Sequence, residues 1–198
     1  MIDITKALAI PGMMLGGELL WLAEQASTRK RIVEVGSWMG RSTRAIADNQ
    51  PEGAILYAVD TWRGTPSKTA TDAECTMYNR ELAGKPEAWL YQQFIQNLKD
   101  VNVIAFPLPS IYAAHYFYRS GEPFDMIFLD AAHDYDSVKA DLMAWRPMLA
   151  AGGLLCGHDY HDYKGRFPGV DRAVDEQIPR VKTLGVGSLW YEVRKRGV

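Results

Sequence analysis

The chain has 198 residues, 47% of them hydrophobic, and a net charge of −2; this length fits one domain with a sizeable core. The charge provides no strong basic field, which argues against a nucleic-acid partner, and no apolar run reaches the roughly 18 residues of a membrane span. No signal peptide is visible, and Cys75 and Cys156 suggest reduced thiols, so we expect a cytoplasmic protein.

Helices and strands are predicted to alternate along the chain. Helical spacing of apolar residues and clusters of β-branched residues locate most of them. The predicted helices are 15–27, 41–48, 87–98, 110–118, 136–149 and 170–178. The predicted strands are 31–36, 54–60, 101–106, 124–130 and 154–158, followed by an antiparallel hairpin of 181–186 and 188–194, joined tightly at Gly187.

This order predicts an α/β fold. The strands are apolar without clean alternation, which is typical of parallel strands buried under helices on both faces of a sheet. We therefore expect one doubly wound, Rossmann-like domain over 1–198. The polar stretch 61–86 is long for a connection within a domain, so it is interpreted as a lid or an insertion.

The loop after the first strand indicates a binding site. Gly36 and Gly40 let the backbone turn sharply and approach a ligand closely. A dinucleotide site would need a third glycine between them, opening the helix that holds a pyrophosphate. Trp38 stands in that place, which argues against an NAD-dependent oxidoreductase.

Two carboxylates define the expected ligand more closely. Glu34, at the end of the first strand, suits the ammonium group of an amino acid, and Asp60, at the end of the second, suits ribose hydroxyls. A nucleoside that carries an amino acid matches both, and that ligand is S-adenosylmethionine (SAM). The alternative is that the glycines only form a tight turn and Asp60 only caps a turn.

Residues 33–42 resemble motif I of class I SAM-dependent methyltransferases, and the order of elements from 15 to 193 resembles that family's. The resemblance implies a mostly parallel seven-stranded sheet whose last strand is antiparallel. It also implies adenine contacts around 108–110. The cofactor-binding residues predicted on both grounds are Glu34, Gly36, Ser37, Trp38, Gly40, Ser42, Asp60, Thr61, Trp62, Ser110, Asp130 and Ala131.

Acidic and histidine side chains follow the fourth and fifth strands. Because neighbouring parallel strands end at the same edge of a sheet, Asp130, His133, His158 and Asp159 should converge beside the cofactor. In one interpretation Asp130, His158 and Asp159 bind Mg²⁺ or Mn²⁺ and His133 takes the acceptor's proton. In the other, no metal binds and a histidine acts alone as the base. A strand-end aspartate can also merely cap a helix.

The segment Asp130-x-x-His133 and the later Gly-Gly…His158-Asp159-Tyr160 resemble a subgroup of small-molecule O-methyltransferases. It includes macrocin-type sugar O-methyltransferases and cephalosporin-hydroxylase-like proteins. The resemblance implies metal ligands at Asp130, His158 and Asp159 and a catalytic base at His133, with Asp130 also catalytic. His158 departs from the pattern, since those proteins more often have an acidic residue there, and histidine suits Mn²⁺ better than Mg²⁺.

The sequence thus predicts SAM-dependent O-methylation of a small hydroxylated acceptor, such as a sugar or a phenol. A polar aromatic loop, 160–167, suits such an acceptor. The alternatives are a SAM- or nucleoside-binding module without catalysis and an N-methyltransferase. The latter is disfavoured because the Asn/Asp-Pro-Pro-aromatic motif is absent. Abundant tryptophan and tyrosine suggest a homo-oligomer.

Overall fold

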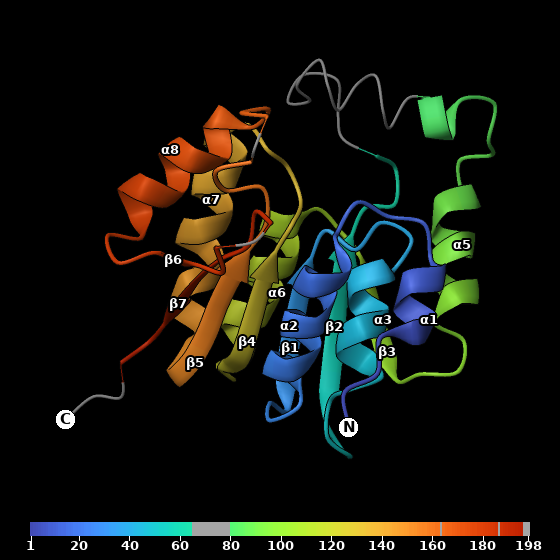
Figure 1. Ribbon diagram of the computed structural model, residues 1–198, viewed down its shortest axis with the longest axis horizontal. Helices are drawn as coiled ribbons and strands as arrows, with labels where there is room; N and C mark the ends of the chain where they lie inside the picture. Colours follow the sequence, from blue (N-terminus) through green and yellow to red (C-terminus); the bar gives the residue numbers. More distant parts are fainter. Residues whose placement is uncertain (65–79, 163, 186, 196–198) are drawn as a thin grey trace.

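The computed structural model describes residues 1–64, 80–162, 164–185 and 187–195 (Figure 1). Within these ranges no helix has both the length and the apolar character needed to cross a membrane. The described residues of the predicted lid are 61–64 and 80–86, and its central part lies outside the described residues.

A seven-stranded sheet, with strand order β3-β2-β1-β4-β5-β7-β6, runs through the molecule. The first five strands pair in parallel, and β7 is antiparallel to both β5 and β6. The predicted doubly wound sheet with its antiparallel last strand is therefore confirmed. The strands are β1 (Arg31–Val35), β2 (Ile55–Asp60), β3 (Val103–Pro107), β4 (Phe124–Leu129), β5 (Leu149–Gly157), β6 (Lys182–Thr183) and β7 (Trp190–Val193).

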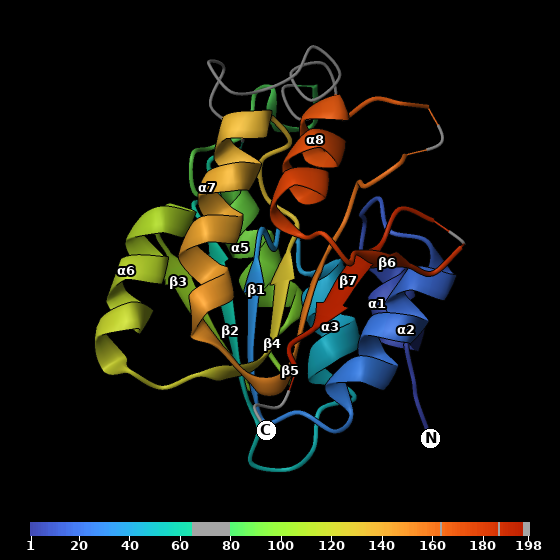
Figure 2. The same ribbon diagram turned by 90° about the vertical axis from the view of Figure 1, so that its left-hand side faces the viewer.

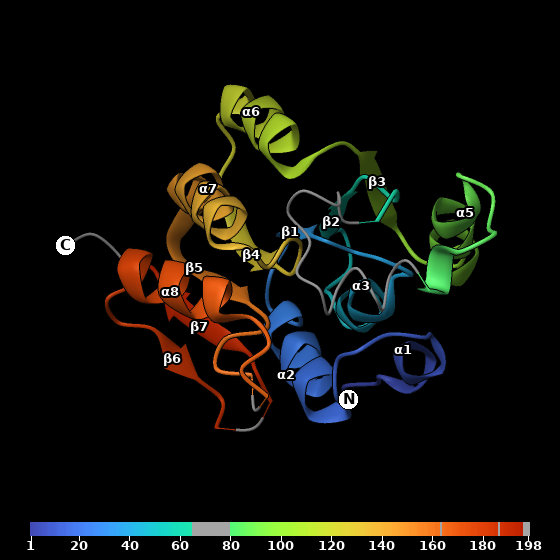
Figure 3. The same ribbon diagram turned by 90° about the horizontal axis from the view of Figure 1, so that it is seen from above.

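Helices cover both faces of the sheet, as Figure 3 shows from above. One face carries α6 (Ser110–Ser120), α7 (Tyr135–Trp145) and α8 (Pro168–Gln177), with the short 3₁₀ helix η1 (Arg146–Met148) after α7. The other carries α1 (Thr5–Ala9), α2 (Gly16–Ala26), α3 (Arg41–Ala47) and α5 (Trp89–Asn97). Figure 2 shows α6, α7 and α8 side by side along the sheet.

Apolar side chains from both sheet faces make the cores. Phe117 of α6 and Trp145 of α7 are buried against Ile127 of β4 on one side. On the other side, Leu22 of α2 and Phe128 of β4 belong to a second buried cluster. Because β4 contributes to both clusters with successive residues, it is buried on both faces, as its unbroken apolar sequence predicts.

The predicted strand 154–158 is wrong at its start, since β5 begins at Leu149. Gly152 and Gly153 were expected to follow a helix, but they lie within β5, where they exchange backbone hydrogen bonds with Arg194. A register shift against β4 between Phe124 and Met126 accommodates the added residues. The two glycines were interpreted as the boundary between a helix and a strand, but they mark an irregular part of the strand instead.

The C-terminal hairpin is antiparallel, as predicted, but its connection is longer than expected. Thr183 pairs with Trp190, so residues 184–189 join the strands instead of a tight turn at Gly187. The reason is that Ser188 is held elsewhere: its backbone N–H donates to Glu18 of α2 at 2.8 Å. The short helix α1 was not predicted from the sequence at all.

Candidate active site

The loop between β1 and α3 follows β1 directly and contains two glycines with left-handed φ angles near 90°, Gly36 and Gly40. A Cβ atom on Gly36 would lie 1.9 Å from the Asp130 carbonyl oxygen, so only glycine allows the β1 loop to contact the end of β4. Trp38 also has a positive φ, of 47°. The predicted glycine requirement thus has two causes, backbone conformation and close approach.

Asp60, the last residue of β2, organises this loop. Its carboxylate accepts hydrogen bonds from the backbone N–H groups of Ser37 and Trp38, each at 2.9 Å, and of Trp62 at 2.7 Å. Burial raises the pKa of Asp60, and these hydrogen bonds oppose the rise. Asp60 therefore stabilises the loop and also lines the cavity described next.

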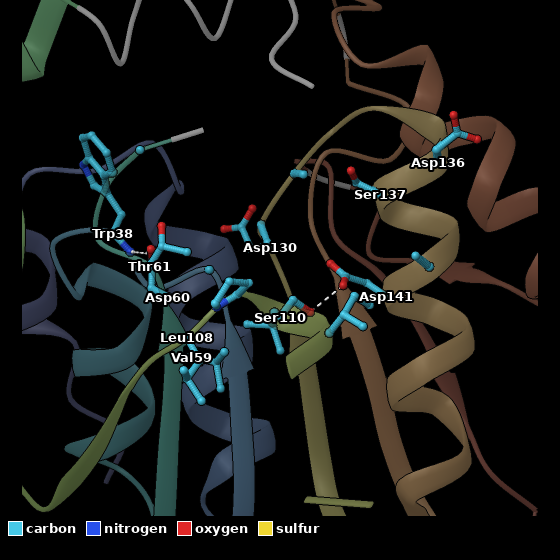
Figure 4. Close-up of a pocket in the computed structure, with 18 residues that line it drawn as sticks. Trp38, Val59, Asp60, Thr61, Leu108, Ser110, Asp130, Asp136, Ser137 and Asp141 are labelled. Atoms are coloured by element: carbon cyan, nitrogen blue, oxygen red, sulfur yellow. Dashed lines mark hydrogen bonds between the residues drawn. The ribbon is translucent and has the colours of Figure 1, made fainter. Parts of the chain in front are cut away.

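A cavity of about 420 Å³ opens at the carboxyl ends of β1, β2 and β4 (Figure 4). Of the residues predicted to bind the cofactor, seven line it: Gly36, Trp38, Asp60, Thr61, Ser110, Asp130 and Ala131. Leu108, Pro109 and Ile111 form one end with Ala140 and Asp141 of α7. This set joins segments far apart in sequence, which the order of the parallel strands brings to one edge.

A smaller cavity of about 90 Å³ adjoins the first and shares Gly36, Trp38 and Asp130 with it. Its other predicted residues are Ser37, Ser42, His133, His158 and Asp159. Residues that the sequence analysis did not single out complete it: Gly12, Met13, Met14, Arg41. Arg166 and Phe167, from the polar aromatic loop 160–167, also line this cavity, where an acceptor was expected.

Glu34 and Trp62 line neither cavity. Glu34 is fully buried beneath the loop and accepts a hydrogen bond from the Thr43 hydroxyl. Trp62 is 2% exposed, packs against Tyr91 and Phe94, and donates from its indole N–H to the Trp38 carbonyl. Both residues support the loop from behind. Gly40, the N-cap residue of α3, also lines neither cavity.

The four strand-end residues converge as the topology predicts. The His133 Nε2 atom lies 2.8 Å from Asp159 Oδ2, and His158 Nδ1 lies 3.2 Å from the same oxygen. His158 Nδ1 is 3.8 Å from Asp130 Oδ1. Asp159 reaches this position with a φ of 62°, a left-handed conformation that aspartate tolerates better than most residues.

Glu18 of α2 completes the group and was not predicted. It is 2% exposed, and its Oε1 atom lies 3.1 Å from His158 Nε2. The Leu15 backbone N–H donates to its other oxygen at 2.8 Å. Glu18 shares the buried stripe of α2 with Leu19 and Leu22, and a carboxylate on an apolar helix face was the available sequence signal.

The buried charges shift one another's pKa values. Burial lowers the pKa of His158, but Asp130, Asp159 and Glu18 outweigh it and hold that pKa well above its usual value. Burial raises the pKa of Asp159, but hydrogen bonds with His133 and His158 outweigh it, so its pKa is lowered. Asp130 goes the other way, since burial raises its pKa to about 6 against the attraction of His158. The cluster therefore combines ionised and proton-accepting groups.

These carboxylates and imidazoles offer ligand atoms for a divalent metal. One ligand atom from each of Asp130, His133 and Asp159 lies within 4.8 Å of the others. The ligand set predicted from the sequence has His158 in place of His133 beside the carboxylates of Asp130 and Asp159. His158 Nδ1 lies near both carboxylates, at the distances given above. Two carboxylates with an imidazole are a donor set suited to Mn²⁺, so the residues fit the predicted ion.

Comparison with known proteins agrees with this geometry. Residues 33–160 match a family model described as "Methyltransferase domain", which covers more than half of the chain. The chain therefore belongs to this methyltransferase family, and the predicted SAM-dependent methyltransferase is confirmed. Among proteins with curated descriptions, none matches the chain.

Solved structures share the class I fold at low sequence identity. CalS11, a calicheamicin methyltransferase, has a TM-score of 0.65 at 17% identity and covers 89% of this chain and 77% of its own. The O-methyltransferase NovP has a TM-score of 0.61 at 18% identity, and the match covers 90% of this chain and 80% of NovP. An O-methyltransferase from Bacillus cereus, solved in complex with SAH, has a TM-score of 0.58 at 15% identity, and the match covers 96% of this chain and 86% of that protein.

The contact between Gly36 and Asp130 generates a stability prediction. Gly36→Ala should lower the free energy of unfolding by more than about 3 kcal/mol, because its Cβ would overlap backbone atoms. The matched control is Gly53→Ala, which has a similar φ of 75° but open space around its Cβ, and should cost only about 1–2 kcal/mol. Urea unfolding of both variants measures the difference, and equal losses would contradict a steric requirement at Gly36.

Glu34 generates a prediction about pH. Burial raises its pKa to about 7, although hydrogen bonds from Ser42 and Thr43 oppose the rise. Between pH 4.5 and 7 the folded chain keeps a proton that the unfolded chain releases, so this group's stabilisation is lost as the pH rises. Glu34→Gln lacks this titration. Its free energy of unfolding, relative to that of the wild type, should therefore rise by roughly 1–3 kcal/mol between pH 5 and pH 8.

Urea unfolding at several pH values tests this, with Glu52→Gln as a control because Glu52 is exposed. Parallel stability curves for wild type and Glu34→Gln would show that Glu34 keeps an ordinary pKa in the fold.

Proposed function

We propose that this methyltransferase transfers the methyl group of SAM to a hydroxyl oxygen of a small molecule. The acceptor oxygen attacks the methyl carbon as the carbon–sulfur bond breaks, which releases S-adenosylhomocysteine, and the hydroxyl proton passes to a base. The observation that carries the proposal is the paired His133 and Asp159 in the wall of the smaller cavity, next to the cofactor loop.

His133 is the proposed base. Its ring is 5% exposed and stacks on Phe167, with the ring centres 4.4 Å apart and the planes at 25°. Asp159 lies 2.8 Å from its Nε2 atom. Packing on one side and a carboxylate on the edge fix the ring, and the carboxylate stabilises the imidazolium that forms when His133 accepts the proton.

Asp60 and the loop at 36–40 are proposed to hold the cofactor. The Asp60 carboxylate in the cavity wall supports the predicted contact with ribose hydroxyls. Asp130 lines both cavities, so it adjoins both the cofactor and the acceptor. The sulfonium of SAM is already activated, so correct positioning and a deprotonated acceptor are the protein's main contributions.

We further propose that Asp130, His158 and Asp159 hold a divalent cation, with Mn²⁺ better suited than Mg²⁺ to a site with histidine, while His133 does not bind the ion and acts as the base. Such an ion would lower the pKa of the acceptor hydroxyl. Glu18 supports His158 as the donor, since a carboxylate on the outer ring nitrogen orients metal-binding histidines in many sites.

The acceptor class follows from the pocket and from relatives. The smaller cavity mixes the Phe167 ring with the guanidinium groups of Arg41 and Arg166, which suits a hydroxylated sugar or phenol. A structure related in fold is described as a TDP-rhamnose 3'-O-methyltransferase. The predicted homo-oligomer and the expected lack of a nucleic-acid partner stay predictions.

An N-methyltransferase is the second candidate, because a structure with the same fold and 12% identity is described as the N-methyltransferase NodS. A neutral amine attacks through its nitrogen lone pair and does not have to lose a proton first, so it does not require a strong base. The buried pair of His133 and Asp159 therefore favours a hydroxyl acceptor. A module that binds SAM without catalysis would not need this pair either.

His133→Ala should reduce methyl transfer by about 10²–10⁴-fold while SAM affinity changes by only a few-fold, because the ring lies in the smaller cavity. Turnover in a panel of sugars, phenols and amines, with SAM affinity from calorimetry, measures both effects. The matched control is His161→Ala, whose exposed ring pairs with Asp171. Full activity of His133→Ala with its best acceptor would refute the proposed base.

Mn²⁺ should raise the melting temperature of the wild type. The rise should be smaller for Asp159→Asn, since asparagine tolerates the left-handed conformation but lacks the charge. At a hundred times its Kd, the ion should add about 2.7 kcal/mol to the wild type. Thermal unfolding with Mn²⁺ or EDTA and paramagnetic resonance of bound Mn²⁺ are the measurements. Asp171→Asn is the control, and the same Mn²⁺ affinity in all three proteins would refute the site.

A further inference from the structure

A groove of about 820 Å³ lies between the carboxyl ends of α7 and α8 and the end of β7. It shares no residue with the two cavities of the candidate active site. It borders the start of β5 at Leu149, whereas those cavities open at the carboxyl ends of the parallel strands. In Figure 1 the C-terminal segment leaves β7 at the lower edge of the sheet, and β2 ends at the upper edge. The groove is therefore a separate feature of the molecule.

Positive charge is concentrated in this groove. Its charged lining residues are one carboxylate and five cations: Glu192, Arg146, Arg180, Lys182, Arg194 and Lys195. The whole chain, by contrast, has a net charge of −2. Like charges around one concave surface repel one another, and the walls of a groove focus their field. The arrangement therefore favours an anion between them.

Two of the cations are held by the protein itself. Arg146 Nε and Nη2 lie 3.0 and 2.8 Å from the two carboxylate oxygens of Glu192, and Nη1 donates to the Gln177 carbonyl at the end of α8 at 3.1 Å. Arg194 donates to the carbonyl oxygens of Pro147 and Leu149. The carboxylate among the described lining residues is thus already paired, and it does not neutralise the remaining cations.

The other three cations have no such structural role. Arg180, Lys182 and Lys195 are exposed and form no ion pair with the described part of the chain. They stand on three segments: the connection between α8 and β6, β6 itself, and the residues after β7. Cations at a helix end can stabilise the helix dipole, but the effect is confined to the last turn and does not account for β6 or the C-terminal segment.

The same groove has apolar walls, formed by Leu142, Met143, Pro147, Leu149 and Val193. Met143 is 61% exposed and Val193 is 48% exposed, so part of this surface is open to a ligand. Apolar walls with a few charged groups are typical of small-molecule sites, whose volumes run from about 300 to 1,000 Å³. An inorganic ion would leave these walls uncovered, whereas an organic anion would cover them.

We propose that this groove binds a small organic phosphate with several negative charges, such as a nucleoside triphosphate. The phosphates lie beside Arg180, Lys182 and Lys195, and the organic part lies on the apolar walls. A guanidinium binds two phosphate oxygens at once and lysine adds a mobile point charge, so these residue types suit a phosphate chain. The net charge of −2 provides no extended basic field for a nucleic acid. The proposal does not depend on methyl transfer, because the groove has its own residues.

Calorimetry with CTP tests the groove, with saturating S-adenosylhomocysteine and EDTA present so that the candidate active site does not contribute. Arg180→Gln/Lys182→Gln should bind CTP at least about tenfold more weakly than the wild type, because two charged hydrogen-bond donors are lost. The matched control is Lys30→Gln/Lys99→Gln, which removes two exposed charges that do not line the groove and should keep the wild-type affinity. Equal weakening in both double variants would overturn the site, because it would show only general charge attraction.

Inorganic triphosphate carries the charges without the organic part. Its affinity should fall in Arg180→Gln/Lys182→Gln and stay unchanged in Met143→Ser, whereas the affinity for CTP should fall in both variants. Met143 is exposed, so its replacement should leave the fold intact. Wild-type CTP affinity in Met143→Ser would contradict the placement of the organic part. Absence of CTP binding to the wild type at millimolar concentration would overturn the whole proposal.

Discussion

The close backbone contact between Gly36 and Asp130 is the constraint on which the site depends. The Asp130 backbone N–H donates to Val35 and the Gly36 N–H donates to Val59, each at 2.8 Å, so three strand ends are joined at one point. Any side chain on Gly36 would separate them. Since Asp130 lines both cavities, its position relative to the β1–α3 loop fixes how the proposed sites for methyl donor and acceptor adjoin.

Several buried carboxylates both stabilise backbone segments and border or contact the site. Asp60 accepts hydrogen bonds from two backbone N–H groups of the β1–α3 loop and from the backbone N–H of Trp62, and it still borders the cavity. Glu18 ties the start of α2 to His158 and to Ser188 before β7. Buried charges of this kind are costly without partners. The described contacts supply them, which couples the geometry of the site to the packing of distant segments.

The sequence predicted what depends on strand order and turn chemistry. Parallel topology alone was enough to bring Asp130, His133, His158 and Asp159 together. It did not reveal Glu18 or Asp141, because both stand on apolar helix stripes and their partners are distant in sequence, as with Glu18 and His158. Nor could it show that Glu34 lies beneath the loop, since strand periodicity does not indicate how deeply a side chain is covered.

Charge balance around His158 links protons to metal binding. Glu18, Asp130 and Asp159 all approach its ring, so a protonated His158 already provides part of the positive charge that these carboxylates need. A divalent ion bound by the same carboxylates would compete with that proton, because a ligating imidazole must be neutral at the metal. A carboxylate in place of this imidazole would be ionised near neutral pH, so a proton would not compete with the ion there. At the proposed metal site, a histidine would therefore make ion occupancy depend on pH more than a third carboxylate would.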